Sequence, residues 1–189
     1  ETALGIKVPE LRTLEGEIGK SHGTALELWA SGIHEARLLA GMIDEVKKVT
    51  PEQMDAWTED FDSWDVCDQA CSNLFDKTPF AYEKIRQWAE SEQEFVRRAA
   101  FALLAVVAVH DKKAEDGVFL EFLPLIEKHS GDERNFVKKA INWALRQIGK
   151  RNSALNKEAV KTAHKIAIQP SKSARWIAAD ALRELKSAS

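Results

Sequence analysis

Hydrophobic residues recur every three or four positions along nearly the whole chain, which is the pattern of amphipathic helices that bury one face. The predicted helices cover residues 10–19, 23–30, 33–48, 51–60, 64–75, 79–89, 92–109, 115–128, 134–149, 154–168 and 171–187. Proline, which lacks a backbone N–H, lies at or near four of the predicted starts, at Pro9, Pro51, Pro79 and Pro170. The side chains predicted to cap helix starts are Thr50, Ser63, Thr78 and Ser153. The pattern therefore predicts an all-α protein.

Composition supports this prediction and limits the domain organisation. The chain has 189 residues, of which 44% are hydrophobic, with only 9 Gly and 5 Pro, too few for a protein built on tight β-turns. The predicted connections are short, so consecutive helices are expected to pack antiparallel in a single domain over residues 1–189. The longest apolar run, residues 99–109, is well short of a membrane span.

A weak repeat is present in the second helix of each predicted pair. Residues 96–104 read Val-Arg-Arg-Ala-Ala-Phe-Ala-Leu-Leu, and residues 137–145 match them at an offset of 41. Residues 174–182 follow 37 later, residues 66–74 lie 30 earlier, and residues 36–40 fit loosely. This pattern resembles the second helix of a HEAT repeat, which predicts a curved α-solenoid of antiparallel helix pairs whose second helices line a concave face. The alternative is an irregular helical bundle.

The repeat register predicts which side chains share a face. It aligns Asp68, Arg98, Lys139 and Trp176 in one column. Trp64 lies one helical turn before this column and Trp143 one turn after it. Polar and aromatic side chains in these columns indicate a lined groove, whereas Trp29, Trp57 and Trp88 fit the buried faces of their helices.

The distribution of charge suggests a polyanionic partner. The net charge is −3, but residues 134–189 carry 13 Lys and Arg against three acidic residues, a net of +10. The preceding 133 residues therefore carry −13. A basic last third favours a partner such as nucleic acid on one part of the surface.

Other kinds of site find no support in the sequence. Cys67 and Cys71 are four apart in a predicted helix, a spacing that disfavours a disulfide, and no secretory signal pattern is visible, so we expect a reduced, cytoplasmic protein. The histidines lack metal-site spacing, and no phosphate-binding glycine motif is present. We therefore expect no metal and no cofactor.

Three strings carry a specific resemblance. They are Ser-Trp-Asp-Val-Cys-Asp at 63–68, Phe-Val-Arg-Arg-Ala-Ala at 95–100, and Phe-Val-Lys-Lys-Ala-Ile-Asn-Trp-Ala-Leu-Arg at 136–146. In this order and spacing they resemble the HEAT-like-repeat DNA alkylation repair family, the AlkD-type DNA glycosylases, from about Leu28 to the C-terminus.

The resemblance implies an enzyme that removes N3- and N7-alkylated purines from duplex DNA by cutting the N-glycosidic bond. Asp68 matches the family's catalytic carboxylate, and Trp64, Trp143 and Arg98 match the residues around it. Arg98 and six further cations are expected to contact phosphates; the six are Arg97, Lys138, Lys139, Arg146, Lys172 and Arg175.

Each of these residues also has a structural interpretation. Trp64 and Trp143 could belong to the core, and Asp68 could pair with Arg98. Arg97, Lys138 and Arg146 could pair with neighbouring acids, and the role of Trp176 is undecided.

Two other functions remain open, both for a chain that we expect to be monomeric. One is a DNA-binding protein of the same fold without catalysis, and the other is a helical protein–protein scaffold. Convergence of the predicted basic side chains on one surface favours DNA, whereas scatter favours the scaffold.

Overall fold

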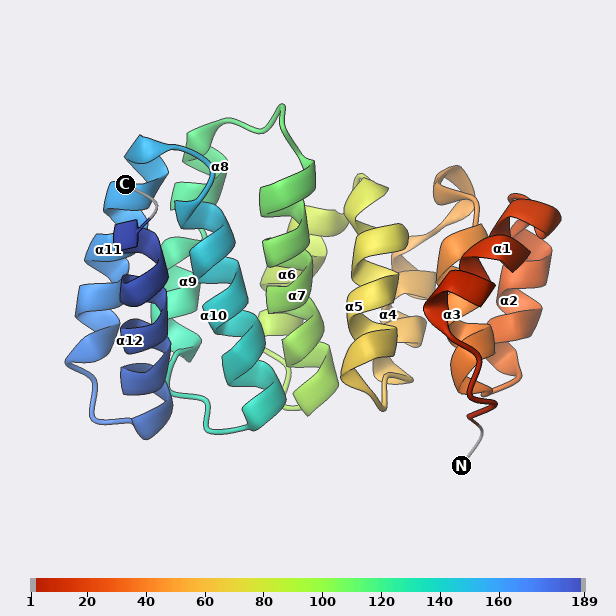
Figure 1. Ribbon diagram of the computed structural model, residues 1–189, viewed down its shortest axis with the longest axis horizontal. Helices are drawn as coiled ribbons and strands as arrows, with labels where there is room; N and C mark the ends of the chain where they lie inside the picture. Colours follow the sequence, from red (N-terminus) through yellow and green to blue (C-terminus); the bar gives the residue numbers. More distant parts are fainter. Residues whose placement is uncertain (1–2, 188–189) are drawn as a thin grey trace. The chain divides into compact units, whose positions relative to one another are not determined.

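The structure is a computed structural model that describes residues 3–187, and these residues form helices joined by short loops (Figure 1). The α-helices are α1 (Val8–Ile18), α2 (His22–Ala30), α3 (His34–Ile43), α4 (Pro51–Glu59), α5 (Trp64–Asn73), α6 (Ala81–Ala89), α7 (Glu94–His110), α8 (Asp116–Leu120), α9 (Leu123–His129), α10 (Asn135–Gly149), α11 (Ser153–Ala167) and α12 (Lys172–Ser187). Two short 3₁₀ helices are η1 (Val46–Lys48) and η2 (Phe75–Lys77). The all-helical prediction is confirmed, and none of the described residues forms a strand.

The chain divides into two compact units, Glu1–Ala81 and Tyr82–Ser189. We refer to them as unit 1 and unit 2. The prediction of a single domain over residues 1–189 stays a prediction.

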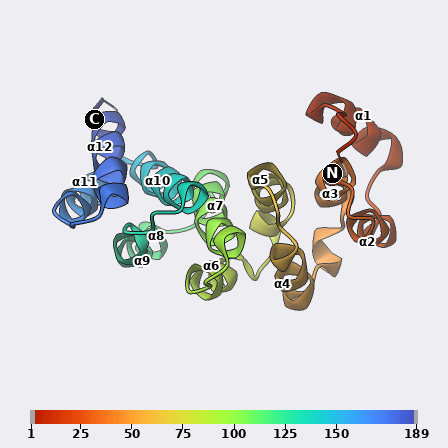
Figure 2. The same cartoon turned by 90° about the horizontal axis from the view of Figure 1, so that it is seen from below.

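Unit 2 consists of two layers of helices (Figure 2). Helices α6, α9 and α11 form one layer, and α7, α10 and α12 form the other. The helices of one layer run antiparallel to those of the other (Figure 1), and α10 packs against both α7 and α12. This is the arrangement predicted from the repeat, in which the second helices of successive pairs lie side by side.

Unit 1 is centred on α3, which contacts α1, α2 and α5. Its aromatic core is a stacked pair, Trp29 from α2 and Trp57 from α4, whose ring centroids are 4.0 Å apart. Phe61 packs edge-on against Trp29, and Phe75 lies tilted against Trp57. Trp29, Trp57 and Trp88 are all buried, as the hydrophobic pattern predicted.

One predicted helix, 33–48, ends earlier than expected. Its regular part stops at Ile43, and Asp44 takes an extended conformation with φ −63° and ψ 151°. The fully buried Asp44 carboxylate lies 2.6 Å from His22 Nδ1 and accepts a hydrogen bond from Gln53 Nε2 at 2.6 Å. A helical Asp44 could not serve both partners, so these tertiary contacts override local helix propensity.

Two other predicted helices also end or break earlier. The stretch 115–128 divides into α8 and α9, and Pro124 lies in the first turn of α9, where it cannot donate a backbone hydrogen bond to an earlier turn. The stretch 64–75 ends at Asn73 because Leu74 leaves the helical conformation with φ −131° and ψ −60°.

The predicted N-caps are only partly correct. Thr50 accepts a hydrogen bond from the Gln53 backbone N–H at 3.1 Å, as expected. Ser63 makes no capping hydrogen bond, and Asn152 rather than Ser153 caps α11. Thr78 instead donates to the Phe75 carbonyl oxygen at 2.8 Å, which closes the turn of η2.

The segment before α1 is held by a single carboxylate. Glu35, buried in α3, accepts hydrogen bonds from the backbone N–H groups of Leu4 at 2.8 Å, Gly5 at 2.7 Å and Ile6 at 3.3 Å. These bonds, that from Leu4 most strongly, lower the pKa of Glu35 although burial opposes the shift. The ionised carboxylate thus fixes the start of the chain to α3.

Candidate functional site

In unit 1, helix α5 presents the two residues that the sequence placed at the reacting centre. Trp64 is the first residue of α5, and its 52% exposure excludes it from the core. Asp68 follows one turn later and is half-buried. Because residues four apart share a helix face, the indole and the carboxylate lie on the same side of α5. This pair is the candidate reacting site.

The buried residues of α5 anchor the helix. Val66, Cys67, Ala70 and Cys71 are buried, and the two cysteines form no disulfide. Gly41 of α3 allows a close approach to this face, since a Cβ added there would lie 3.6 Å from Ala70 Cα. Small residues at this contact let α3 and α5 pack closely.

The other acid of α5, Asp65, lies in its first turn and has a structural role. Asp65 Oδ2 lies 2.9 Å from Nε2 of His34 in α3, and Asp65 Oδ1 accepts a hydrogen bond from the Val66 backbone N–H. This carboxylate therefore helps to fix the start of α5 and the position of Trp64.

In unit 2, Arg98 differs from the expectation of a phosphate contact. Its side chain is only 6% exposed, and Nη1 donates to the Phe136 carbonyl oxygen at 2.6 Å. Arg98 thus links α7 to the start of α10. A guanidinium used in this way lies below the surface, so the structure does not support the predicted phosphate contact.

Arg97 is also paired within the protein, which is the structural interpretation that the sequence left open for it. Its Nη1 donates to Asp132 at 2.9 Å, and its Nε donates to the Ala89 carbonyl oxygen at 3.1 Å. Burial raises the pKa of Asp132, but the hydrogen bonds from Arg134 and Arg97 outweigh it and lower this pKa to about 2. The charge of Arg97 is therefore neutralised within the protein.

Arg146 is paired within the protein in the same way. It donates a hydrogen bond to Glu184 of α12 and lies 3.8 Å from Asp180. Lys150 also pairs with Glu184. Arg146 therefore helps to join α10 to α12, and its charge is not available to a phosphate.

The contacts between α10 and α12 also correct the predicted register by one residue. Asn142 Nδ2 donates to Asp180 at 2.7 Å, and Lys138 Nζ lies 5.3 Å from the centroid of the Trp176 ring. Residues that contact each other between α10 and α12 are thus 38 positions apart, whereas the aligned repeats predicted 37. Lys138 therefore contacts Trp176 in place of the predicted Lys139. Trp143, next to Asn142, is half-buried on α10.

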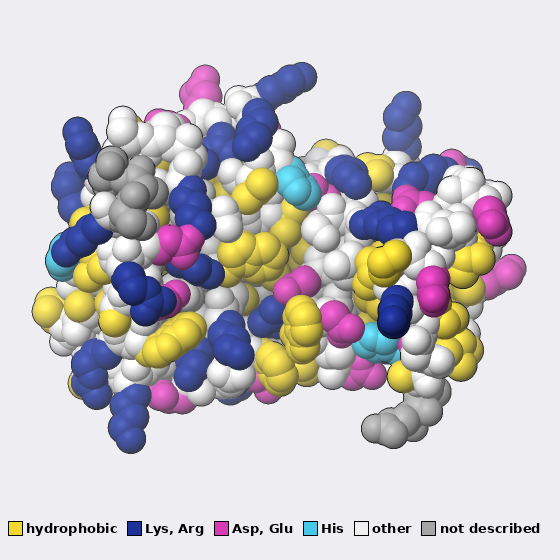
Figure 3. All heavy atoms as spheres, in the orientation of Figure 1, with side chains coloured by type: hydrophobic (Ala, Val, Ile, Leu, Met, Phe, Trp, Pro, Cys, Tyr) yellow, Lys and Arg dark blue, Asp and Glu magenta, His cyan; other side chains and the backbone are white. Residues whose placement is uncertain are grey.

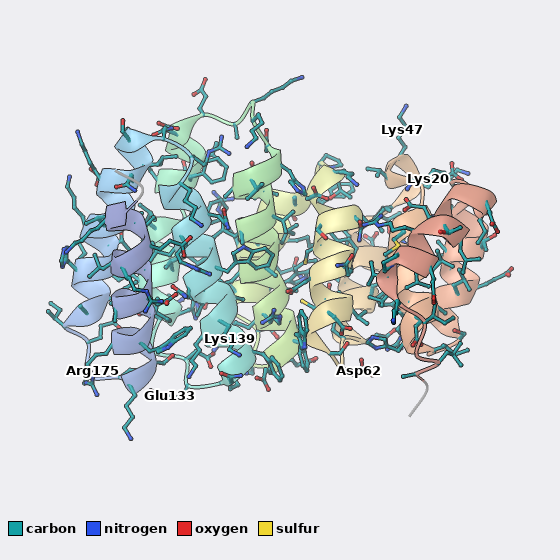
Figure 4. All side chains as sticks on the ribbon, viewed as in Figure 1. Lys20, Lys47, Asp62, Glu133, Lys139 and Arg175 are labelled. Atoms are coloured by element: carbon teal, nitrogen blue, oxygen red, sulfur yellow. The ribbon has the colours of Figure 1, made fainter. Side chains whose placement is uncertain are left out.

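Four of the predicted DNA-binding cations remain available at one end of unit 2. Lys139, Lys172 and Arg175 are exposed, and the half-buried Lys138 lies over Trp176. Figure 4 places Lys139 and Arg175 at the end where α10 and α12 begin. Figure 3 shows Lys and Arg side chains around this end of unit 2, with hydrophobic surface between them. We call Lys138, Lys139, Lys172, Arg175 and Trp176 the basic edge.

A groove of about 660 Å³ lies in unit 2 between α8, α9 and α11. Leu120, Leu123 and Pro124 line one side of it, and Lys157 and Lys165 lie on the other. None of the predicted site residues is among the residues that line it.

Residues 3–187 contain neither a metal-binding cluster nor a membrane-spanning helix. Among residues 3–187, no group of three or more His, Cys, Asp or Glu side chains is arranged to hold a metal ion. No helix in this part of the chain is both long and apolar enough to cross a membrane.

Comparison with known proteins gives the family. The family model described as DNA alkylation repair enzyme matches residues 1–185, which is nearly the whole chain. The chain belongs to the DNA alkylation repair enzyme family. The resemblance noted in the three sequence strings is thereby confirmed. A comparison with curated proteins gave no match.

A solved structure supports the fold of this member of the DNA alkylation repair family. It superposes with a TM-score of 0.81 at 18% identity and covers 98% of this chain and 84% of its own. It is described as belonging to a new family of proteins related to the HEAT-like repeat DNA glycosylases, with affinity for branched DNA structures. At this identity the likeness establishes the fold, which is that of HEAT-like repeats.

The acids that neutralise the arginines of this family member were missed by the sequence interpretation. Asp180 and Glu184 occur 38 residues after Asn142 and Arg146, so a repeat offset of 38 would have revealed both partners. Asp132 lies in a loop outside the repeat, and no periodic signal marks it.

Proposed function

We propose that this protein is a DNA glycosylase that excises N3- or N7-alkylated purines from duplex DNA, acting as a cytoplasmic monomer. The observation that carries the proposal is the pairing of Asp68 with the exposed Trp64 on one face of α5, in a member of the DNA alkylation repair enzyme family. An indole that exposes half its surface beside a carboxylate is suited to a cationic ligand.

The chemistry of the substrate explains the role of a carboxylate. Alkylation at N3 or N7 leaves a positive charge on the purine, so the base departs with the electron pair of its bond to C1′ and becomes neutral. Positive charge then develops on the sugar. A fixed carboxylate near C1′ stabilises this charge, and water adds to C1′ and loses a proton. We assign the carboxylate role to Asp68.

The aromatic residues suit the charge of the lesion. A cationic purine over an indole gains about 0.5–2 kcal/mol from the cation–π interaction. Trp64 is the stronger candidate because it is exposed beside Asp68. Trp143 of unit 2 is half-buried and remains a second candidate through the family resemblance.

The contacts with DNA are assigned to the basic edge. Lys139, Lys172 and Arg175 are exposed and lie in the last third of the chain, residues 134–189, which carries the excess of positive charge. They would bind phosphates without regard to base sequence. We omit Arg97, Arg98 and Arg146 from this role because they are engaged within the protein.

Excision of 7-methylguanine from a methylated duplex tests the proposal. We expect the wild type to release the base and Asp68→Asn to release it at least about 100-fold more slowly, as for the loss of one electrostatic contact to a transition state. The matched control is Asp62→Asn, because Asp62 precedes α5 and its side chain is 75% exposed. Equal rates for Asp68→Asn and the wild type, or no release by a folded wild type, would overturn the proposal.

A second candidate function is DNA binding without excision. It is favoured by the description of the superposed structure, which names affinity for branched DNA. Binding of methylated and branched duplexes with no base release would support it. Absence of any DNA affinity would instead favour a protein–protein scaffold.

A further inference from the structure

The basic edge contains an exposed tryptophan that the proposed reaction does not use. Trp176 is the fifth residue of α12 and is 40% exposed, whereas Trp29, Trp57 and Trp88 are buried. Burial of an indole is strongly favourable, so a tryptophan left at the surface is a candidate for binding.

The surroundings of Trp176 are predominantly cationic. Lys138 Nζ lies 5.3 Å from the ring centroid, Arg175 is its neighbour in α12, and Lys139 and Lys172 are exposed nearby. Within residues 3–187, Lys139 and Lys172 form no ion pair. These four cations and Trp176 all lie within the first five residues of α10 or α12, and Figure 4 shows Lys139 and Arg175 at that end of unit 2.

The acids near this surface are already engaged. Glu133, in the loop before α10, accepts hydrogen bonds from Ser171 Oγ at 2.6 Å and from the Ser173 backbone N–H at 3.3 Å. Asp180, one turn after Trp176, accepts a hydrogen bond from Asn142 and another from Arg183. These acids reduce the positive charge of the basic edge but leave it basic.

An aromatic face among cations is the combination that binds unpaired nucleotides. The face of a base stacks on the ring, and the cations contact the flanking phosphates. A continuous duplex offers phosphates only, because its base faces are covered by neighbouring bases. Phosphate contacts alone would need the lysines and the arginine but would make no use of the exposed part of the Trp176 ring.

We propose that Lys138, Arg175 and Trp176 form a subsite for an unpaired nucleotide of DNA next to a duplex. The proposal rests on the proposed DNA-binding function and adds a class of substrate, duplex DNA with a single-stranded extension. The base stacks on the indole of Trp176, while Lys138 and Arg175 bind the adjoining phosphates.

Binding of two labelled DNAs tests the subsite. One is a blunt duplex, and the other is the same duplex with a single-stranded tail of about six nucleotides. We expect the wild type to bind the tailed duplex more tightly. Trp176→Ala should lower the affinity for the tailed DNA by about 5- to 150-fold, the range for one base stacked on an aromatic ring, and leave the affinity for the blunt duplex unchanged. Trp176→Phe should keep most of the preference because it keeps an aromatic face.

A spectroscopic readout and a matched control accompany the affinities. The fluorescence of 2-aminopurine placed in the tail should fall on binding to the wild type and stay higher with Trp176→Ala. Ile168→Ala is the control, because Ile168 is 86% exposed at the end of α11 in the same unit. This variant should bind both DNAs like the wild type.

The results that would overturn the subsite differ from those that would overturn the proposed glycosylase function. Equal binding of blunt and tailed DNA by the wild type overturns the subsite and leaves glycosylase activity standing. The same conclusion follows if Trp176→Ala has an unchanged circular dichroism spectrum and lowers the affinity for both DNAs equally. No binding of either DNA by the wild type overturns both proposals.

Discussion

At the scale of single residues, the partner of each arginine decides what the arginine does. Arg97 and Arg134 both bond to Asp132, whose side chain is only 6% exposed. Removing charges from water is unfavourable unless they are paired and hydrogen-bonded, so this cluster is a structural unit rather than a binding surface. Within residues 3–187, the exposed Lys139 has no such partner and keeps its charge for a ligand.

Replacing Asp132 by Asn should therefore destabilise the protein in a pH-dependent way. Since the pKa of Asp132 is lowered to about 2, its ionised form contributes stability that is present above its ordinary pKa of 3.8 and lost as the pH falls toward 2. At neutral pH we expect Asp132→Asn to reduce the free energy of unfolding by about 2 kcal/mol or more. Urea unfolding followed by circular dichroism at several pH values measures this.

The matched control for this prediction is an exposed ion pair in the same unit. Glu121 pairs with Arg86 at 2.8 Å, with both side chains at least half exposed. Glu121→Gln should change the free energy of unfolding by less than about 1 kcal/mol. The prediction for Asp132 would be contradicted if the wild type and Asp132→Asn differed in free energy of unfolding by the same amount at the lowest pH as at neutral pH.

At the scale of helices, close approach depends on small residues at the contacts. Gly41 lies against Ala70 where α3 meets α5. Gly149 lies at the end of α10, where a Cβ would come within 2.6 Å of Leu185 Cδ2 in α12 and 3.0 Å of Ala159 Cβ in α11. The packing of α10 against α11 and α12 thus leaves little room for a larger residue at Gly149, whereas a Cβ at Gly41 would meet Ala70 at an ordinary contact distance.

Gly149→Ala should accordingly destabilise unit 2. Alanine favours a helix more than glycine by about 1 kcal/mol, but overpacking costs about 1–3 kcal/mol, so we expect a net loss or no gain. Gly117→Ala is the control because no atom lies within 4 Å of its added Cβ, and it should be neutral or stabilising. Thermal unfolding of the two variants gives the comparison, and stabilisation by Gly149→Ala would refute the packing argument.

At the scale of the whole molecule, the charge is divided along the chain. The net −3 combines +10 in residues 134–189 with −13 before them. Ion pairs reduce the effective charge, since Arg146 and Lys150 both pair with Glu184, but the exposed lysines of the basic edge retain theirs. A moderately acidic protein therefore has a local surface suited to a polyanion.

The salt dependence of DNA binding should report this surface. Each lysine that neutralises a phosphate contributes about 0.9 to the slope of log K against log salt concentration. Lys139→Ala and Lys172→Ala should each lower affinity and reduce the slope by about that amount. Lys47→Ala, which removes an exposed lysine of unit 1 (Figure 4), should leave the slope unchanged. Equal effects of all three variants would show that binding is not localised to the basic edge.

The sequence by itself determined the helices, most of the core and the family. Hydrophobic periodicity is a local property, so it located α2, α4 and α10 to within about two residues and predicted the burial of Trp29, Trp57 and Trp88. The string at 63–68 puts Trp64 and Asp68 one turn apart on one helix face, because a face follows from spacing. Their assignment to a reacting site comes from the family resemblance and stays a prediction.

Only the tertiary structure decided which charges are available. Arg97, Arg98 and Arg146 carry the same charge in the sequence as Arg175, but they bond to Asp132, the Phe136 carbonyl oxygen and Glu184, groups 35 to 38 residues away. The break at Asp44 likewise depends on His22 and Gln53. Such partners are brought together by the packing of helices, and a shift of one residue in register exchanges Lys139 for Lys138 beneath Trp176. Local pattern therefore determined the elements, and packing determined which of their polar groups remain available for DNA.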